Sequence, residues 1–140
     1  MVLWDFDGTL AYRPGMWRSA ILEALDHHLP GHGVDEEQVR PLIRDGFPWH
    51  RPQEPHPQLS DPEAWWRHVG GLLNKTMRQL GFDEEASARL ADAARRRYID
   101  PSSFRVFDDA RPTLESLSAG GWRHIVLSNH VPEIASIVDG

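Results

Sequence analysis

The sequence predicts an α/β protein in which a parallel-sheet core is interrupted by a helical insertion at residues 14–103. Two apolar segments, residues 2–4 and 122–129, have the character of strands that are covered on both faces. Between them, apolar residues recur at helical spacing. The expected order is therefore a strand, four helices, and then a helix, a strand and a final helix.

Size and composition narrow the possible functions. A chain of 140 residues suffices for one domain, or for a compact core with an insertion, and 40% hydrophobic residues favour a buried core. The net charge of -6 gives no basic field, so neither nucleic acid nor a membrane is expected as a partner. The absence of cysteine excludes disulfides and thiolate chemistry. Because no signal peptide or membrane-length apolar run is present, a cytoplasmic location is expected.

The insertion carries helix signals along most of its length. Helices are expected at residues 15–29, from Asp35 onward, at 60–80 and at 83–100. Asp35 with Gln38, and Ser60 with Glu63, have the spacing of capping boxes. The five prolines of residues 46–62 predict an extended loop, and Pro41 should keep the second helix brief.

Glycines mark two further positions. Gly70 and Gly71 lie inside the third expected helix and predict a break or close helix packing there. After the insertion, residues 110–121 predict a helix that ends at two glycines, and Pro132 lies near the start of the last helix.

Polar side chains follow both expected strands. Asp5 and Asp7 are two residues apart, so they point to the same side at the end of the first strand. Ser128 and Asn129 end the second strand and offer a hydroxyl and an amide. Taken singly, these motifs are typical of a turn and of a helix cap. Taken together, they predict a carboxylate pair facing a phosphate site at one edge of the sheet.

The segments "DFDGTL" and "VLSN", separated by the helical insertion, resemble the haloacid dehalogenase superfamily, and most closely its phosphatase-like members. The resemblance implies a Rossmann-like core of residues 1–13 and 104–140, incomplete with two strands, and an α-helical cap of residues 14–103. It implies that Asp5 is the nucleophile that forms an aspartyl phosphate. It implies that Asp7 is the general acid, and this second aspartate favours phosphoryl transfer over carbon–halogen cleavage.

The resemblance also implies a cofactor and phosphate contacts. Mg²⁺ is expected on the Asp5 carboxylate and the backbone carbonyl of Asp7, because a carboxylate that attacks a phosphate faces like-charge repulsion. Thr9, Ser128 and Asn129 are expected to contact the phosphate of the substrate.

The sequence departs from the family pattern after Ser128. The lysine or arginine and the acidic metal motif that the family places downstream do not follow, and the only later acidic residues are Glu133 and Asp139. Lys75, the only lysine, is expected to be a solvated helix residue. We therefore expect the chain to be the N-terminal portion of a longer enzyme, with little or no turnover by itself.

Specificity is expected to depend on the cap, which closes over the site in this family. Arg13, Trp17 and Trp49 are the candidate specificity residues, the last of these within the stretch 46–58. Trp65 or Trp66 is expected in the core of the cap. The clustered histidines at positions 27, 28, 32, 50 and 56 lack zinc-motif spacing, so surface or loop roles are expected for them.

The resulting functional hypothesis is a Mg²⁺-dependent phosphomonoester hydrolase that acts on a small phosphorylated metabolite. One alternative is a phosphomutase or another phosphotransferase that uses the same two aspartates. The other is a binding or regulatory module without catalysis, which applies if the chain is complete. Substrate identity and oligomeric state are not specified by the sequence.

Overall fold

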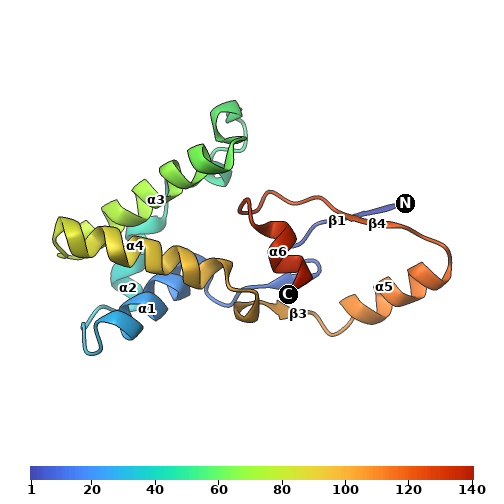
Figure 1. Ribbon diagram of the computed structural model, residues 1–140, viewed down its shortest axis with the longest axis horizontal. Coiled ribbons are helices and arrows are strands. Elements are labelled where there is room, and N and C mark those ends of the chain that lie inside the picture. The colour runs from blue at the N-terminus through green and yellow to red at the C-terminus, as the bar shows by residue number, and fades with distance from the viewer. The chain divides into compact units, whose positions relative to one another are not determined.

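The computed structural model describes all residues, 1–140, and the chain divides into two compact units. The first unit comprises Met1–Pro14 together with Asp100–Gly140, and the second comprises Gly15–Ile99 (Figure 1). These boundaries differ by only a few residues from those expected for the core, residues 1–13 and 104–140, and for the insertion, residues 14–103. The mixture of helices with a small parallel sheet is compatible with the α/β class.

A two-stranded parallel sheet forms the centre of the first unit. Strand β1 (Val2–Trp4) pairs with β4 (His124–Val126), and the register places Val2 opposite His124 and Trp4 opposite Val126. The N–H of Leu127 continues the pairing by donating to the carbonyl of Trp4 at 2.8 Å. Both strands occur where the apolar segments predict them, although β4 is shorter than the segment.

Two helices accompany this sheet in the first unit. Helix α5 (Ala110–Ala119) ends at a glycine pair, of which Gly121 has a φ of 80° that a residue with a side chain rarely adopts. Helix α6 (Ile134–Asp139) is short, and a 3-10 turn, η4 (Pro101–Ser103), opens the returning segment. The buried apolar side chains of the unit are few: Phe6, Ala11, Ala110, Val131 and Ile137.

A short antiparallel ladder in the first unit was not predicted from the sequence. Strand β2 (Ala11–Tyr12) pairs with β3 (Arg105–Val106), and the N–H of Phe107 donates to the carbonyl of Leu10 at 3.1 Å. Two residues are too few for any periodicity to show. The ladder pairs the segment that precedes the second unit in the sequence with the segment that follows it, so it holds these two segments of the first unit together.

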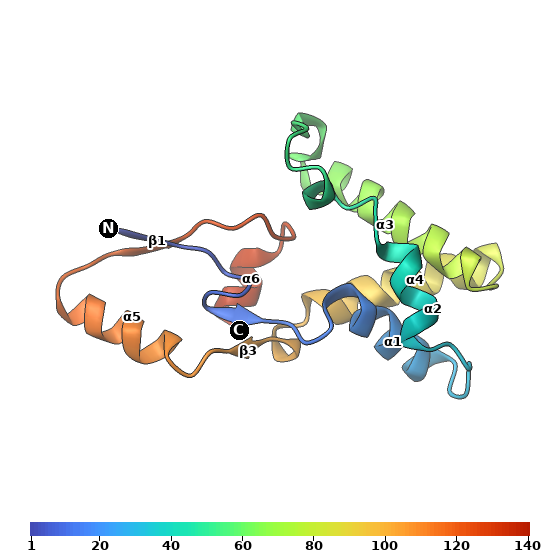
Figure 2. The same cartoon turned by 180° about the vertical axis from the view of Figure 1, so that it is seen from behind.

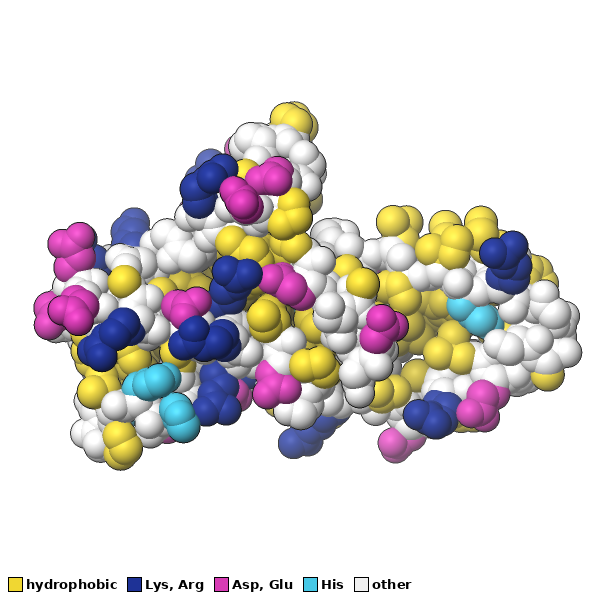
Figure 3. Space-filling model, in the orientation of Figure 1, with side chains coloured by type: hydrophobic (Ala, Val, Ile, Leu, Met, Phe, Trp, Pro, Cys, Tyr) yellow, Lys and Arg dark blue, Asp and Glu magenta, His cyan; other side chains and the backbone are white.

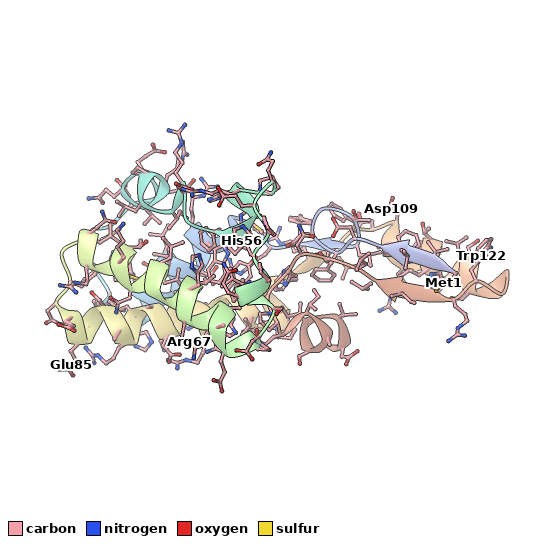
Figure 4. All side chains as sticks on the ribbon, turned by 90° about the horizontal axis from the view of Figure 1, so that it is seen from above. Met1, His56, Arg67, Glu85, Asp109 and Trp122 are labelled. Atoms are coloured by element: carbon pink, nitrogen blue, oxygen red, sulfur yellow. The ribbon has the colours of Figure 1, made fainter.

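The parallel sheet exposes apolar side chains. Leu3 is 55% exposed and Ile125 is 47% exposed, and hydrophobic atoms gather along β1 and β4 in the space-filling view (Figure 3). Met1 and Trp122, both exposed, lie at the same end of this sheet (Figure 4). Parallel sheets are normally covered on both faces, so this sheet exposes surface of a kind that proteins usually bury.

Three helices pack together in the second unit. Helix α4 (Glu84–Ile99) lies against both α1 (Met16–His28) and α3 (Pro62–Gln79) (Figure 2). Their apolar residues at helical spacing supply the buried core: Ile21, Leu25, Val69, Leu73, Met77 and Leu90. None of the helices of the protein is both long and apolar enough to cross a bilayer.

The second expected helix is as brief as its proline predicts. Helix α2 (Glu36–Val39) begins with the predicted capping box, in which Asp35 Oδ1 accepts from Gln38 N and Gln38 Oε1 accepts from Asp35 N, both at 2.9 Å. A 3-10 turn, η1 (Arg40–Ile43), follows directly, because Pro41 has no N–H to continue the α-helical pattern.

The proline-rich stretch 46–62 contains only two short 3-10 turns, η2 (Pro48–His50) and η3 (Pro57–Leu59), before α3 begins. The predicted capping box at Ser60 is wrong. The cap is Asp61, whose Oδ2 accepts from the N–H of Ala64 at 2.8 Å, while the Ser60 hydroxyl donates to a carbonyl within the preceding turn. Both residues are good caps, and the position of Pro62 at the first turn of α3 leaves the cap site to Asp61.

The predicted break at Gly70 and Gly71 is also wrong. Helix α3 runs through both glycines to Gln79, and a Cβ built at either one would meet no atom within 4 Å, so close packing does not explain them. Glycine costs a helix about 1 kcal/mol relative to alanine. The flanking buried side chains of Val69 and Leu73 hold this part of α3 against its neighbours and offset that cost.

Candidate functional site

The ends of β1 and β4 bring Asp5 and Ser128 into contact. Asp5 directly follows β1, and Ser128 lies two residues beyond β4. The Ser128 hydroxyl donates to Asp5 Oδ1 at 2.7 Å. The parallel register produces this contact, because it aligns Trp4 with Val126 and so carries both chains forward to the same edge. The prediction that the two strand ends lie side by side is confirmed.

Asp5 is oriented by two donors. Its Oδ1 accepts from the N–H of Phe6 at 2.8 Å as well as from the Ser128 hydroxyl. Hydrogen bonds to an ionised acceptor are short and directional, so the two together restrict rotation of the carboxylate. The residue is nevertheless exposed, which leaves the carboxylate accessible from solvent. An accessible, oriented carboxylate can act as a nucleophile or bind a cation.

A tight turn places Asp7 close behind Asp5 in the chain. Gly8 has a φ of 80°, its N–H donates to the carbonyl of Ala11 at 2.8 Å, and the N–H of Ala11 donates to the carbonyl of Phe6 at 3.1 Å. This is the turn that the Asp-Gly pair predicts, and it needs the left-handed backbone that glycine adopts without strain.

The two carboxylate oxygens of Asp7 have different surroundings. Oδ2 lies 3.2 Å from Nε2 of His130. Oδ1 is buried and has no hydrogen-bond partner. A buried carboxylate oxygen without a donor is costly, so a ligand that satisfies this atom would be stabilising.

His130 is the residue of this site that the sequence analysis missed. Its side chain is only 1% exposed, and its ring lies edge-on to Phe6, with centroids 5.5 Å apart, and near Phe104 at 5.7 Å. The histidines that cluster in the sequence, for which surface or loop roles are expected, do not include it. Only its position in the sequence could have indicated a role for His130, because it lies two residues after Ser128, in the loop that follows the second strand.

The other predicted phosphate contacts lie in the same two loops. Thr9 follows Asp7 by two residues in the turn, and Asn129 lies between Ser128 and His130. Both residues are exposed. The structure thus places Asp5, Asp7, Thr9, Ser128 and Asn129 at the ends of two paired strands.

The residues present fit a magnesium ion. Mg²⁺ prefers oxygen ligands, keeps several waters and is commonly bound through one or two carboxylates. The exposed carboxylate of Asp5 is a ligand of this kind, and Asp7, two residues further on, offers its backbone carbonyl oxygen. No group of three or more acidic or histidine side chains that could hold a metal ion is found in the structure, so a site here rests on these two aspartates.

The candidate specificity residues have contrasting surroundings. Arg13 is buried, and its Nη1 donates to the carbonyl of Pro14 at 3.5 Å. Trp17, in α1, is buried, whereas Trp49, in η2, is 37% exposed. Both Trp65 and Trp66 are buried in the second unit, as expected, and Lys75 is exposed on α3, also as expected.

Comparison with known proteins gives one informative similarity. No family model matches the chain. The chain is 31% identical over 84 residues to haloacid dehalogenase-like hydrolase domain-containing protein 3 of Danio rerio. This similarity supports the haloacid dehalogenase superfamily. It covers 59% of the chain and 34% of the zebrafish protein, so the chain spans about a third of the length of that relative.

Proposed function

We propose that the chain carries the phosphoryl-transfer residues of a Mg²⁺-dependent phosphomonoester hydrolase of the haloacid dehalogenase superfamily, which acts on a small phosphorylated metabolite through an aspartyl phosphate. The observation that carries the proposal is the hydrogen bond from Ser128 to Asp5 Oδ1 at the edge where two parallel strands end. The similarity to a haloacid dehalogenase-like hydrolase supports the same chemistry.

Asp5 is the proposed nucleophile. A carboxylate oxygen forms a bond to phosphorus, and the bond from phosphorus to the leaving oxygen of the substrate breaks. Ser128 and the N–H of Phe6 restrict the carboxylate before the reaction, so less orientational freedom is lost on the way to the transition state. The Ser128 hydroxyl can then donate to an oxygen of the phosphate.

Asp7 is the proposed general acid and base. It gives a proton to the leaving oxygen and later accepts one from the water that attacks the aspartyl phosphate at phosphorus, which restores Asp5 and releases phosphate. His130 lies against Asp7 Oδ2 and its ring packs on those of Phe6 and Phe104, so it restricts the orientation of this carboxyl group.

Asp5, through its carboxylate, and Asp7, through its backbone carbonyl, are the proposed holders of Mg²⁺. When bound there, the ion neutralises negative charge on the phosphate and reduces its repulsion of the nucleophile. Thr9 and Asn129 are the proposed additional phosphate contacts. The second unit is the proposed cap, with Arg13, Trp17 and Trp49 as specificity residues.

Trapping the phosphorylated residue tests the proposal without requiring turnover. The chain is incubated with Mg²⁺ and an acyl phosphate donor, and the intact mass and a peptide map are measured. We expect one added phosphoryl group, located on Asp5. The variant Asp5→Asn should lose it, whereas Asp109→Asn, an exposed aspartate of the same unit whose side chain makes no cap hydrogen bond, should keep it.

Two results would overturn the proposal. One is a folded chain that acquires no phosphoryl group in the presence of Mg²⁺. The other is a phosphoryl group that persists in Asp5→Asn. If phosphorylation occurs, transfer to a sugar phosphate rather than to water, followed by product analysis, separates a phosphotransferase from a hydrolase.

A further inference from the structure

The second unit contains an open cavity of about 310 Å³, which is lined by two of the proposed specificity residues, Trp17 and Trp49. Its wall is formed by the start of α1, by η1 and by the segment around η2. This volume is at the lower end of the range of about 300–1,000 Å³ that is typical of small-molecule sites. All of the lining residues belong to the second unit, so the cavity is a property of that unit alone.

Three of the residues that line the cavity are aromatic and belong to one series of stacked rings. Four rings follow one another in stacked pairs: Tyr98 and Trp17 at 3.7 Å, Trp17 and Phe47 at 5.5 Å, and Phe47 and Trp49 at 4.5 Å between centroids. The last three of these residues line the cavity. Tyr98, Trp17 and Phe47 are buried and rigid, whereas Trp49 is 37% exposed, so part of its ring surface is open to a ligand.

Three arginines also line the cavity. They are Arg18, Arg40 and Arg44, which line it together with His50, and no acidic residue does so. Arg18 and Arg40 share Glu36 as an ion-pair partner, so their charge is partly neutralised.

Arg44 supplies the uncompensated charge. Its side chain is exposed and makes no ion pair. The neighbouring carboxylate, that of Asp45, lies instead 3.9 Å from His50 and 3.7 Å from Arg51. A guanidinium that keeps its donors free beside a cavity is suited to an anion.

We propose that this cavity binds a small molecule in which a flat aromatic ring carries an anionic group, with the ring stacked on the aromatic wall and the anion held by Arg44. Aromatic rings and arginines line the same cavity, so a ligand with both features gains from each. Binding of this kind requires neither Asp5 nor Mg²⁺, so it can be tested separately from the proposed phosphoryl transfer.

Calorimetric titration tests the proposal with probes that separate the two features. AMP and phenyl phosphate each combine a ring with an anion, adenosine lacks the anion, and ribose 5-phosphate lacks the ring. We expect AMP or phenyl phosphate, or both, to bind. The probes that lack one feature, adenosine and ribose 5-phosphate, should bind at least tenfold more weakly. The two combined probes distinguish a nucleotide from a simple aryl phosphate. Titrations are made without Mg²⁺, so that the proposed phosphoryl-transfer site contributes least to the signal.

Matched variants assign the site. Arg44→Gln should weaken binding by about ten- to hundredfold, the range for loss of a hydrogen bond to a charged group. Arg89→Gln, which changes an exposed arginine of the same unit that does not line the cavity, should leave binding unchanged. Trp49→Ala should remove the advantage of the ring-bearing probes, and circular dichroism verifies that each variant is folded.

The proposal is overturned if neither AMP nor phenyl phosphate binds at millimolar concentration. It is equally overturned if ribose 5-phosphate binds as tightly as AMP, or if Arg44→Gln and Arg89→Gln have the same effect.

Discussion

Substitutions of Trp17 distinguish the contribution of its ring to the stability of the second unit from any contribution of its N–H group. The indole is 3% exposed and lies 3.7 Å from the ring of Tyr98 with the two planes only 5° apart. A second stacked contact joins it to Phe47 at 5.5 Å. Its Nε1–H, by contrast, has no acceptor. The structure therefore attributes the stabilising effect of Trp17 to its ring and none of it to a hydrogen bond.

The two substitutions at this position have different expected costs. Trp17→Ala removes a buried ring and leaves a cavity, which lowers the free energy of unfolding by about 3–5 kcal/mol. The two stacked contacts account for about 0.5–1.5 kcal/mol each within that sum. Trp17→Phe keeps a stacked ring and breaks no hydrogen bond, so we expect a loss of about 1–2 kcal/mol from the smaller volume alone.

Urea unfolding followed by far-ultraviolet circular dichroism measures both losses, because the second unit is built from helices. Since small domains have free energies of unfolding of about 5–15 kcal/mol, the loss in Trp17→Ala should move the urea midpoint far to lower concentration, and the smaller loss in Trp17→Phe should move it less. Trp122→Phe, which changes an exposed tryptophan of the first unit, should alter the transition by less than about 0.5 kcal/mol.

The reasoning fails if Trp17→Phe is as unstable as Trp17→Ala, because the indole N–H would then make a bond that the structure lacks. It also fails if Trp17→Ala costs less than about 1.5 kcal/mol, since a loss that small is typical of a side chain outside the core.

Two further substitutions test local features. Asp35→Ala should lower the free energy of unfolding by about 1 kcal/mol through loss of the capping box, and thermal unfolding should show no comparable change for Glu37→Ala, which leaves the cap intact. A neutral result for Asp35→Ala would mean that α2 does not need its cap. His130→Leu should destabilise the first unit by about 1–3 kcal/mol, because it leaves Asp7 Oδ2 without its buried partner, and hydrogen exchange of the β1 and β4 amides reports the loss. His130→Gln keeps a donor and should recover part of that loss, and equal exchange in all three proteins would exclude a role for this contact.

Local sequence signals were sufficient for most of the secondary structure. The apolar spacing of α1, α3 and α4, the capping box at Asp35 and the Asp-Gly turn at Gly8 each depend on residues a few positions apart. Interactions at that range are the ones that a sequence displays directly. At Gly70 and Gly71 the low helix propensity of glycine competed with the helical spacing of the apolar residues. The helix continues there because the neighbouring side chains are buried, and burial cannot be read from the sequence.

The partners of the site residues required the folded chain. Asp5 and Ser128 are 123 positions apart, and their contact exists because β1 and β4 pair in parallel with Trp4 opposite Val126. Their motifs made the contact predictable, since both segments end in polar residues. The contact of His130 with Asp7 and the ring stack from Tyr98 to Trp49 had no such motif. They arise from side chains that meet only when distant segments pack, so the sequence alone determined which elements form, and the tertiary structure decided which side chains face one another.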